Sequence, residues 1–92
     1  MADPWTTEPL GAGRYRFTNV SGGRLEMISL YPLGATEVQV VVGGVAGEPH
    51  LVEAGIADGE FFVAVVRGQG VRVTSSTAYP AMRTVIWELA VS

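Results

Sequence analysis

The feature that most constrains this sequence is an apolar residue at every second position, which recurs along much of the chain. In the stretch TEVQVVV, the side chains of Val38, Val40 and Val42 share one face of an extended strand. A period of two residues is the pattern of a half-buried β-strand, whereas helices repeat their apolar positions every three to four residues. Segments rich in glycine or proline separate the alternating stretches, as turns do. The sequence therefore predicts an all-β fold.

We expect about seven antiparallel strands, spaced by about 8–12 residues, in a two-sheet immunoglobulin-like sandwich. The expected strands cover residues 14–19, 24–31, 36–44, 50–53, 59–68, 71–76 and 83–91. They make up a single domain over residues 14–92, which follows a leader segment over residues 1–13.

The apolar phase switches within the strand expected over residues 24–31. Leu25 and Met27 are in one phase, whereas Ile28 and Leu30 are in the other. Such a switch predicts either a β-bulge at Met27–Ile28 or a strand that is apolar on both faces.

Composition excludes several classes of function. The 92 residues include no cysteine, which removes disulfides, thiolate metal sites and a cysteine nucleophile. The net charge is −3 and the six basic residues are scattered arginines, whereas nucleic-acid binding needs a basic excess to neutralise phosphates. No apolar run has the length of a membrane-spanning helix, and the N-terminus lacks the basic start and apolar run of a signal peptide. We expect a cytoplasmic or virion protein, or a domain of a longer chain, with no nucleic-acid or membrane partner.

Two stretches resemble the turns of bacterial immunoglobulin-like sandwich modules. The stretch FTNVSGGRLEMISLY, residues 17–31, ends a strand in an asparagine and a glycine-bearing turn before a new apolar strand begins. The stretch VEAGIADGEFFVAVV is similar to a step between two middle strands of those modules, carried here by Val52, Gly55, Gly59, Glu60 and Phe62. The resemblance spans residues 14–89 and implies the fold, because such modules serve many different functions.

One segment holds several side chains of the types used in catalysis and metal binding: the single histidine, His50, and the carboxylates of Glu53, Asp58 and Glu60. A metal site needs several converging ligands, yet the odd spacing of His50 and Glu53 places them on opposite faces of a strand. Asp58–Gly59 is a pair that turns favour. A calcium site would lack the carboxylate spacing of an EF-hand loop, and a serine triad with His50 would lack a nucleophile-elbow motif. We interpret the segment as a hairpin with an acidic turn, and we expect no metal, cofactor or enzymatic activity.

Several expected strands carry apolar residues on both faces, although one face of each sheet in a sandwich meets solvent. Val41, Phe62 and Ile86 are such surplus apolar residues, which a second chain would cover. Trp5 lies beside Pro4 in the leader, where it is either an exposed anchor for a partner or a cap that folds back on the domain. We predict Trp5, Val41, Phe62 and Ile86 as partner-binding residues.

The leading hypothesis is a non-enzymatic protein-interaction or assembly module. It would associate with itself as a homo-oligomer, or with a protein partner, through an apolar sheet face or edge. One alternative is a structural component of a phage particle or a similar assembly, which would use the same surfaces. Another is a carbohydrate-binding module, in which Trp5, Tyr31 and Tyr79 would stack on sugar rings.

Overall fold

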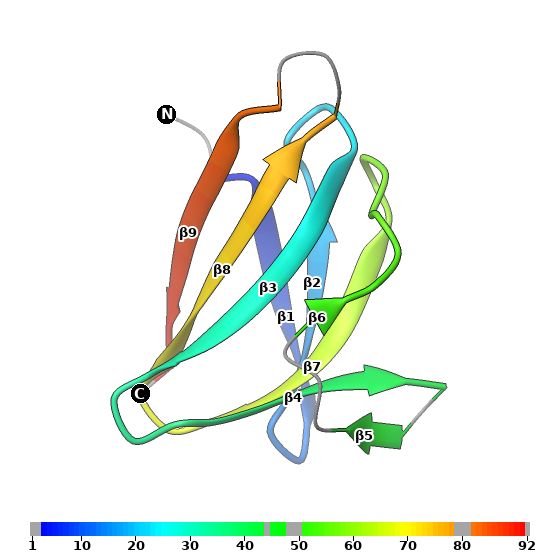
Figure 1. Cartoon of the computed structure of the whole chain (residues 1–92). Helices are drawn as coiled ribbons and strands as arrows, with labels where there is room; N and C mark the ends of the chain where they lie inside the picture. The colour runs from blue at the N-terminus through cyan, green and yellow to red at the C-terminus, as the bar shows by residue number, and fades with distance from the viewer. Residues whose placement is uncertain (1–2, 44, 48–50, 79–81, 92) are drawn as a thin grey trace.

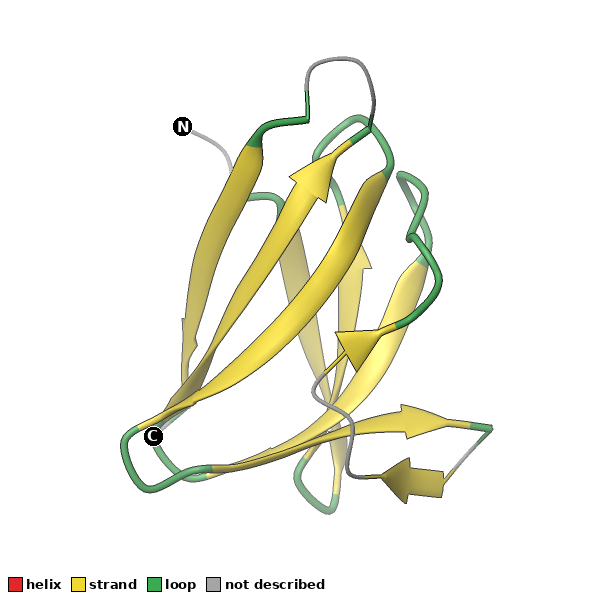
Figure 2. Cartoon of the chain, viewed as in Figure 1, coloured by secondary structure: helices red, strands yellow, loops and turns green. Residues whose placement is uncertain are grey.

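The computed structural model describes residues 3–43, 45–47, 51–78 and 82–91, with the backbone alone for residues 45–47. It confirms the predicted all-β fold, with two antiparallel sheets facing each other (Figure 1). The strands of the described residues are β1 (Trp5–Gly11), β2 (Arg14–Asn19), β3 (Leu25–Leu33), β4 (Glu37–Val42), β5 (Val45–Gly47), β6 (Leu51–Val52), β7 (Phe61–Arg67), β8 (Gly70–Thr77) and β9 (Thr84–Ala90). Loops connect them, and the described residues form no helix (Figure 2).

The five-stranded sheet has the order β1-β2-β7-β4-β5, and the four-stranded sheet has the order β6-β3-β8-β9. Figure 1 shows the four-stranded sheet in front, with β9 at its outer margin. Each of the seven expected strands is present, and β1 and β5 are additional.

The expected boundary after a leader segment is wrong, because residues 5–11 form β1. This strand pairs with β2 from Trp5 opposite Asn19 to Gly11 opposite Arg14. Ordering this segment costs conformational entropy, and burial of the large Trp5 side chain offsets that cost. The domain therefore includes the segment that carries Pro4 and Pro9.

The predicted β-bulge in β3 is confirmed. The register between β3 and β8 shifts between Glu26 and Ser29, which leaves Met27 and Ile28 opposite a single residue. Met27 has a φ of 53° and is exposed, whereas Ile28 is fully buried. The bulge thus turns one apolar residue out of the strand and keeps the next in the core.

Four aromatic side chains form the centre of the core between the sheets. The rings of Phe17 and Phe62 stack with their centroids 4.8 Å apart. Trp5 meets Phe62 edge-on at 5.2 Å, and Trp87 meets Phe17 edge-on at 6.3 Å. Stacked and edge-on aromatic pairs each add about 0.5–1.5 kcal/mol beyond the burial of their area. These contacts join the edge strands β1 and β9 to the middle of the sandwich.

Candidate functional site

The acidic segment before β7 forms the predicted turn. The Glu60 N–H donates to the Ala57 carbonyl at 2.9 Å, and Gly59 has a φ of 86°, which favours glycine. The Asp58 carboxylate accepts the Gly22 N–H at 2.9 Å, so it holds a neighbouring loop. His50 lies outside the described residues, and within them no group of three His, Asp or Glu side chains could hold a metal ion.

The buried Asn19 side chain joins this turn to the turn between β2 and β3. Its Nδ2 donates to the carbonyls of Gly23 and Ile56, both at 2.8 Å, and its Oδ1 accepts the Ser21 N–H at 2.9 Å. The Gly59 N–H also donates to the Asn19 carbonyl at 2.8 Å. Because Asn19 satisfies the backbone of both loops, its role is to hold the fold together.

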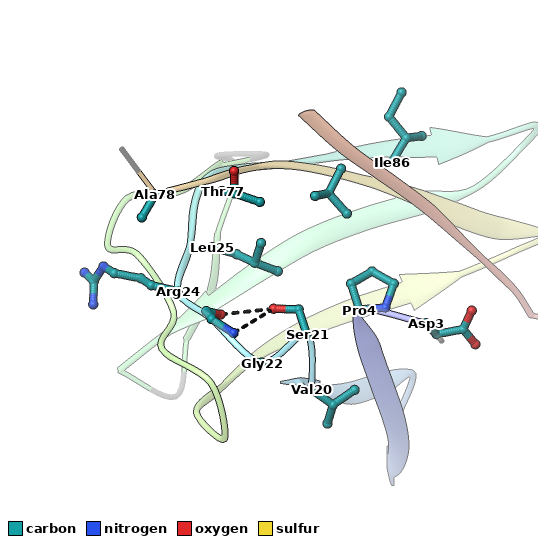
Figure 3. Close-up of a pocket in the computed structure, with 12 residues that line it drawn as sticks. Asp3, Pro4, Val20, Ser21, Gly22, Arg24, Leu25, Thr77, Ala78 and Ile86 are labelled. Carbon is teal, nitrogen blue, oxygen red and sulfur yellow. Dashed lines mark hydrogen bonds between the residues drawn. The ribbon is translucent and has the colours of Figure 1, made fainter. Parts of the chain in front are cut away.

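A cavity of about 570 Å³ opens where the two residues before β1, the β2–β3 turn, the end of β8 and the start of β9 meet (Figure 3). The Ser21 and Arg24 side chains on its wall are engaged within the protein. The Ser21 hydroxyl donates to the Asn19 amide oxygen at 2.7 Å, and Arg24 pairs with Glu26 at 2.9 Å. Figure 3 shows Arg24 extending outward from the turn. We assign no ligand to this cavity.

The structure corrects two of the four predicted partner-binding residues. Trp5 is 1% exposed and Phe62 is 6% exposed, so neither side chain is available to an external partner. Trp5 fills the core, in line with the alternative that it folds back on the domain. Phe62 lies opposite Phe17 in the sheet and shares its inward face, which leaves Phe61 as the outward phenylalanine.

Val41 and Ile86 do face outward, but on different sheets. Val41 is half-buried on the outer face of the five-stranded sheet, opposite Val63. Ile86 is 63% exposed on the outer face of the four-stranded sheet, opposite Thr74. The structure therefore does not bring the four predicted residues together into one site.

The outer face of the four-stranded sheet carries further exposed apolar residues that the sequence analysis did not predict to bind a protein partner. Leu51 and Ile86 lie at the two ends of one cross-strand row, with Ser29 and Thr74 between them. Tyr31 lies in the adjacent row, and Met27 protrudes at the bulge. The phase switch at Met27 was the sequence signal for one of these residues.

The free edge of β9 presents regularly spaced backbone groups. The Thr77 N–H donates to the Arg83 carbonyl and the Val91 N–H donates to the Gln69 carbonyl, so the odd-numbered residues of this segment bond to β8. Hydrogen-bonding direction alternates along an antiparallel strand, so the even-numbered residues direct N–H and C=O away from β8. These residues are Thr84, Ile86, Glu88 and Ala90. Within the described residues, no hydrogen bond reaches these groups.

In the part of the chain that the structure describes, the other three sheet edges are short or interrupted. β6 has two residues and β5 has three. β1 has seven residues, but its register shifts between Pro9 and Gly11. The Val20 N–H donates to the Pro4 carbonyl, so Trp5, Thr7 and Pro9 are the residues of β1 that face the free edge, and proline has no N–H to offer. Proline, bulges and short strands protect sheet edges from pairing, and β9 has none of these features.

No family model matches this chain, and neither a curated protein nor a solved structure matches it significantly. Among the described residues, no helix has the length and apolarity required to cross a membrane.

Proposed function

We propose that this chain is a non-enzymatic assembly module that self-associates through the free edge of β9. The observation that carries the proposal is the difference among the sheet edges. Among the described residues, every second residue of β9 offers N–H and C=O groups without a partner, whereas Pro9 and a bulge interrupt β1, and β5 and β6 are very short. Unpaired groups on a long, regular edge form a template for a further strand.

The strand order supports the proposed immunoglobulin-like class. If the short β5 and β6 are set aside, the sheets have the orders β1-β2-β7-β4 and β3-β8-β9. In chain order, these strands correspond to the A-B-E-D and C-F-G sheets of the constant-type immunoglobulin domain. The proposal therefore retains the resemblance to bacterial immunoglobulin-like modules at the level of topology.

The polar groups of the molecule also favour a structural role. Asn19, Asp58 and Glu60 bond to loop backbone, and four arginines pair with carboxylates at exposed positions. A component of a larger particle would use the same β9 edge. Of the three aromatic residues considered for sugar stacking, Trp5 is buried and Tyr79 lies outside the described residues, which leaves Tyr31.

Sedimentation velocity across a wide concentration range tests the proposal. We expect the wild-type chain to sediment faster as its concentration rises. Thr84→Pro removes an N–H that faces the free edge of β9, so it should shift the association to higher concentration. Thr7→Pro is the matched control, because it removes an N–H that faces the free edge of β1.

Circular dichroism would verify that both variants are folded. A wild-type chain that remains monomeric at every concentration would overturn the proposal. Equal loss of association in Thr84→Pro and Thr7→Pro would also overturn it, because the effect would then be unrelated to β9.

A further inference from the structure

We infer that the β9 edge binds the β9 edge of a second copy, in antiparallel orientation, about a two-fold axis centred on Trp87. The inference rests on the proposed self-association and adds the orientation and the register. It joins the four-stranded sheets of two copies into one continuous sheet.

Symmetry limits the possible registers. A closed homodimer brings the same surface patch of both copies together. When the two-fold axis is perpendicular to the sheet, the paired edge strands run antiparallel and directly opposite side chains lie on the same face. The axis therefore passes midway between one residue and the same residue of the second copy, which lie directly opposite each other.

A centre at Trp87 satisfies every free backbone group of β9. It places Thr84 opposite Ala90 of the second copy, and Ile86 opposite Glu88 of the second copy. All four residues direct N–H and C=O toward the free edge, so each facing pair can exchange two hydrogen bonds. The ladder with β8 reaches from Arg83 to Val91, and Trp87 is its midpoint.

A centre at Ile86 is a poorer match. It would place Ala90 opposite Met82, which has a φ of 43° and precedes the strand. The free groups of Ala90 would then face a backbone that is not extended, and they would remain unpaired. The same shift would place the charged Arg83 opposite Leu89.

The inward-facing side chains of β9 favour the Trp87-centred register. Val85, Trp87 and Leu89 are only partly buried against the core, and no strand of the described residues flanks them on one side. In this register Val85 lies opposite Leu89 of the second copy, and the two Trp87 side chains lie opposite each other. The central pair is of the non-hydrogen-bonded type, in which side chains approach most closely. Apolar surface thus meets apolar surface along the whole inner row.

The charges on the outer face are compatible with this pairing. Glu88 already bonds Arg72 at 2.8 Å within its own chain. In the Trp87-centred register, Glu88 lies opposite Ile86 of the second copy, so no like charges lie directly opposite each other. A centre at Glu88 would instead bring two carboxylates face to face.

Cysteine cross-linking tests the register, because the natural sequence contains no cysteine. Thr84→Cys and Ala90→Cys are prepared as separate chains and then mixed under mild oxidation. A hydrogen-bonded antiparallel pair separates Cα atoms by about 5.5 Å, which is within disulfide range. We expect the mixture to form several-fold more covalent dimer than either chain alone, since two Thr84 positions would lie about 20 Å apart.

Thr6→Cys, on the outer face of β1, is the matched control and should give no covalent dimer with Ala90→Cys. Ile86→Cys alone tests the competing register, and its self-cross-linking above the level of the mixture would overturn the inference. If the wild-type chain self-associates but the mixture matches the Thr6→Cys control, this inference is wrong and the proposed function stands. A strictly monomeric wild-type chain overturns both.

Discussion

The two long edge strands of this sandwich, β1 and β9, have the same length but differ in how their free edges are protected. Both contain seven residues. β1 directs Trp5 into the core and ends in a register shift at Pro9, whereas β9 keeps an unbroken register with β8 and exposes Ile86. The difference shows that edge protection is a local property of a strand, set by one proline and one bulge.

The largest expected effect is the difference in stability loss between an inward-facing residue of β1 and an outward-facing residue of β9. Trp5→Ala should lower the free energy of unfolding by about 3–5 kcal/mol, because it empties a fully buried site beside Phe62. Ile86→Ala should change it by about 0.5 kcal/mol or less, because that side chain is exposed. Urea denaturation measures both.

Trp5→Phe serves as a control for size. The Trp5 Nε1 is buried with no hydrogen-bond partner among the described residues, so its removal relieves an unsatisfied donor. Trp5→Phe should therefore destabilise the protein much less than Trp5→Ala. Equal losses for Trp5→Ala and Ile86→Ala would contradict the contrast between the strands.

The second prediction concerns a proline introduced into β9, of the kind that protects the free edge of β1. The Ile86 N–H faces the free edge, so Ile86→Pro leaves the ladder with β8 intact while it removes a donor and an apolar side chain from the proposed dimer. We expect the dissociation constant to rise at least tenfold, equivalent to about 1.4 kcal/mol. Sedimentation equilibrium measures it, with Ile86→Ala as the control that retains the N–H. An unchanged constant would count against pairing at β9.

The third prediction removes the proline that protects the free edge of β1. Pro9→Thr restores an N–H at a position that faces the free edge of this strand. Because the bulge remains, we expect only a modest rise in species larger than the dimer, seen at the highest concentrations by light scattering. A loss of association in Pro9→Thr would show that β1, and not β9, is the edge in use.

The smallest effect concerns the ion pair beside the β9 edge. The Arg72 and Glu88 side chains are each 48% exposed, so water screens their attraction. Arg72→Ala should therefore change the free energy of unfolding by less than about 1 kcal/mol. A much larger loss in thermal or urea unfolding would mean that the pair supports the sheet.

Alternation of apolar residues was sufficient to predict the two-sheet fold and the seven strands that it covers. It missed β1, because WTTEPLG has one large apolar residue on its inward face and carries a proline. It also misassigned Phe62, because FFVAVV is apolar at every position and a two-residue period cannot then distinguish the faces.

The candidate site was harder to predict than the fold. Ile86 was selected for its outward phase, which the structure reproduces. β9 is an edge strand because the strand order gives it β8 as its one neighbour among the described strands. The sequence pattern does not reveal that order. A sequence shows where strands are, whereas their neighbours depend on contacts between distant segments.

The hydrogen bonds of Asn19 bear on the order in which this chain folds. Its amide reaches Ile56 across 37 positions, and Asp58 reaches Gly22 across 36. Closing so long a segment costs entropy, so we expect these bonds to form after the strands of the sheets have paired. We therefore expect both loops at this end of the molecule to become ordered together, because the buried Asn19 side chain bonds to the backbone of both.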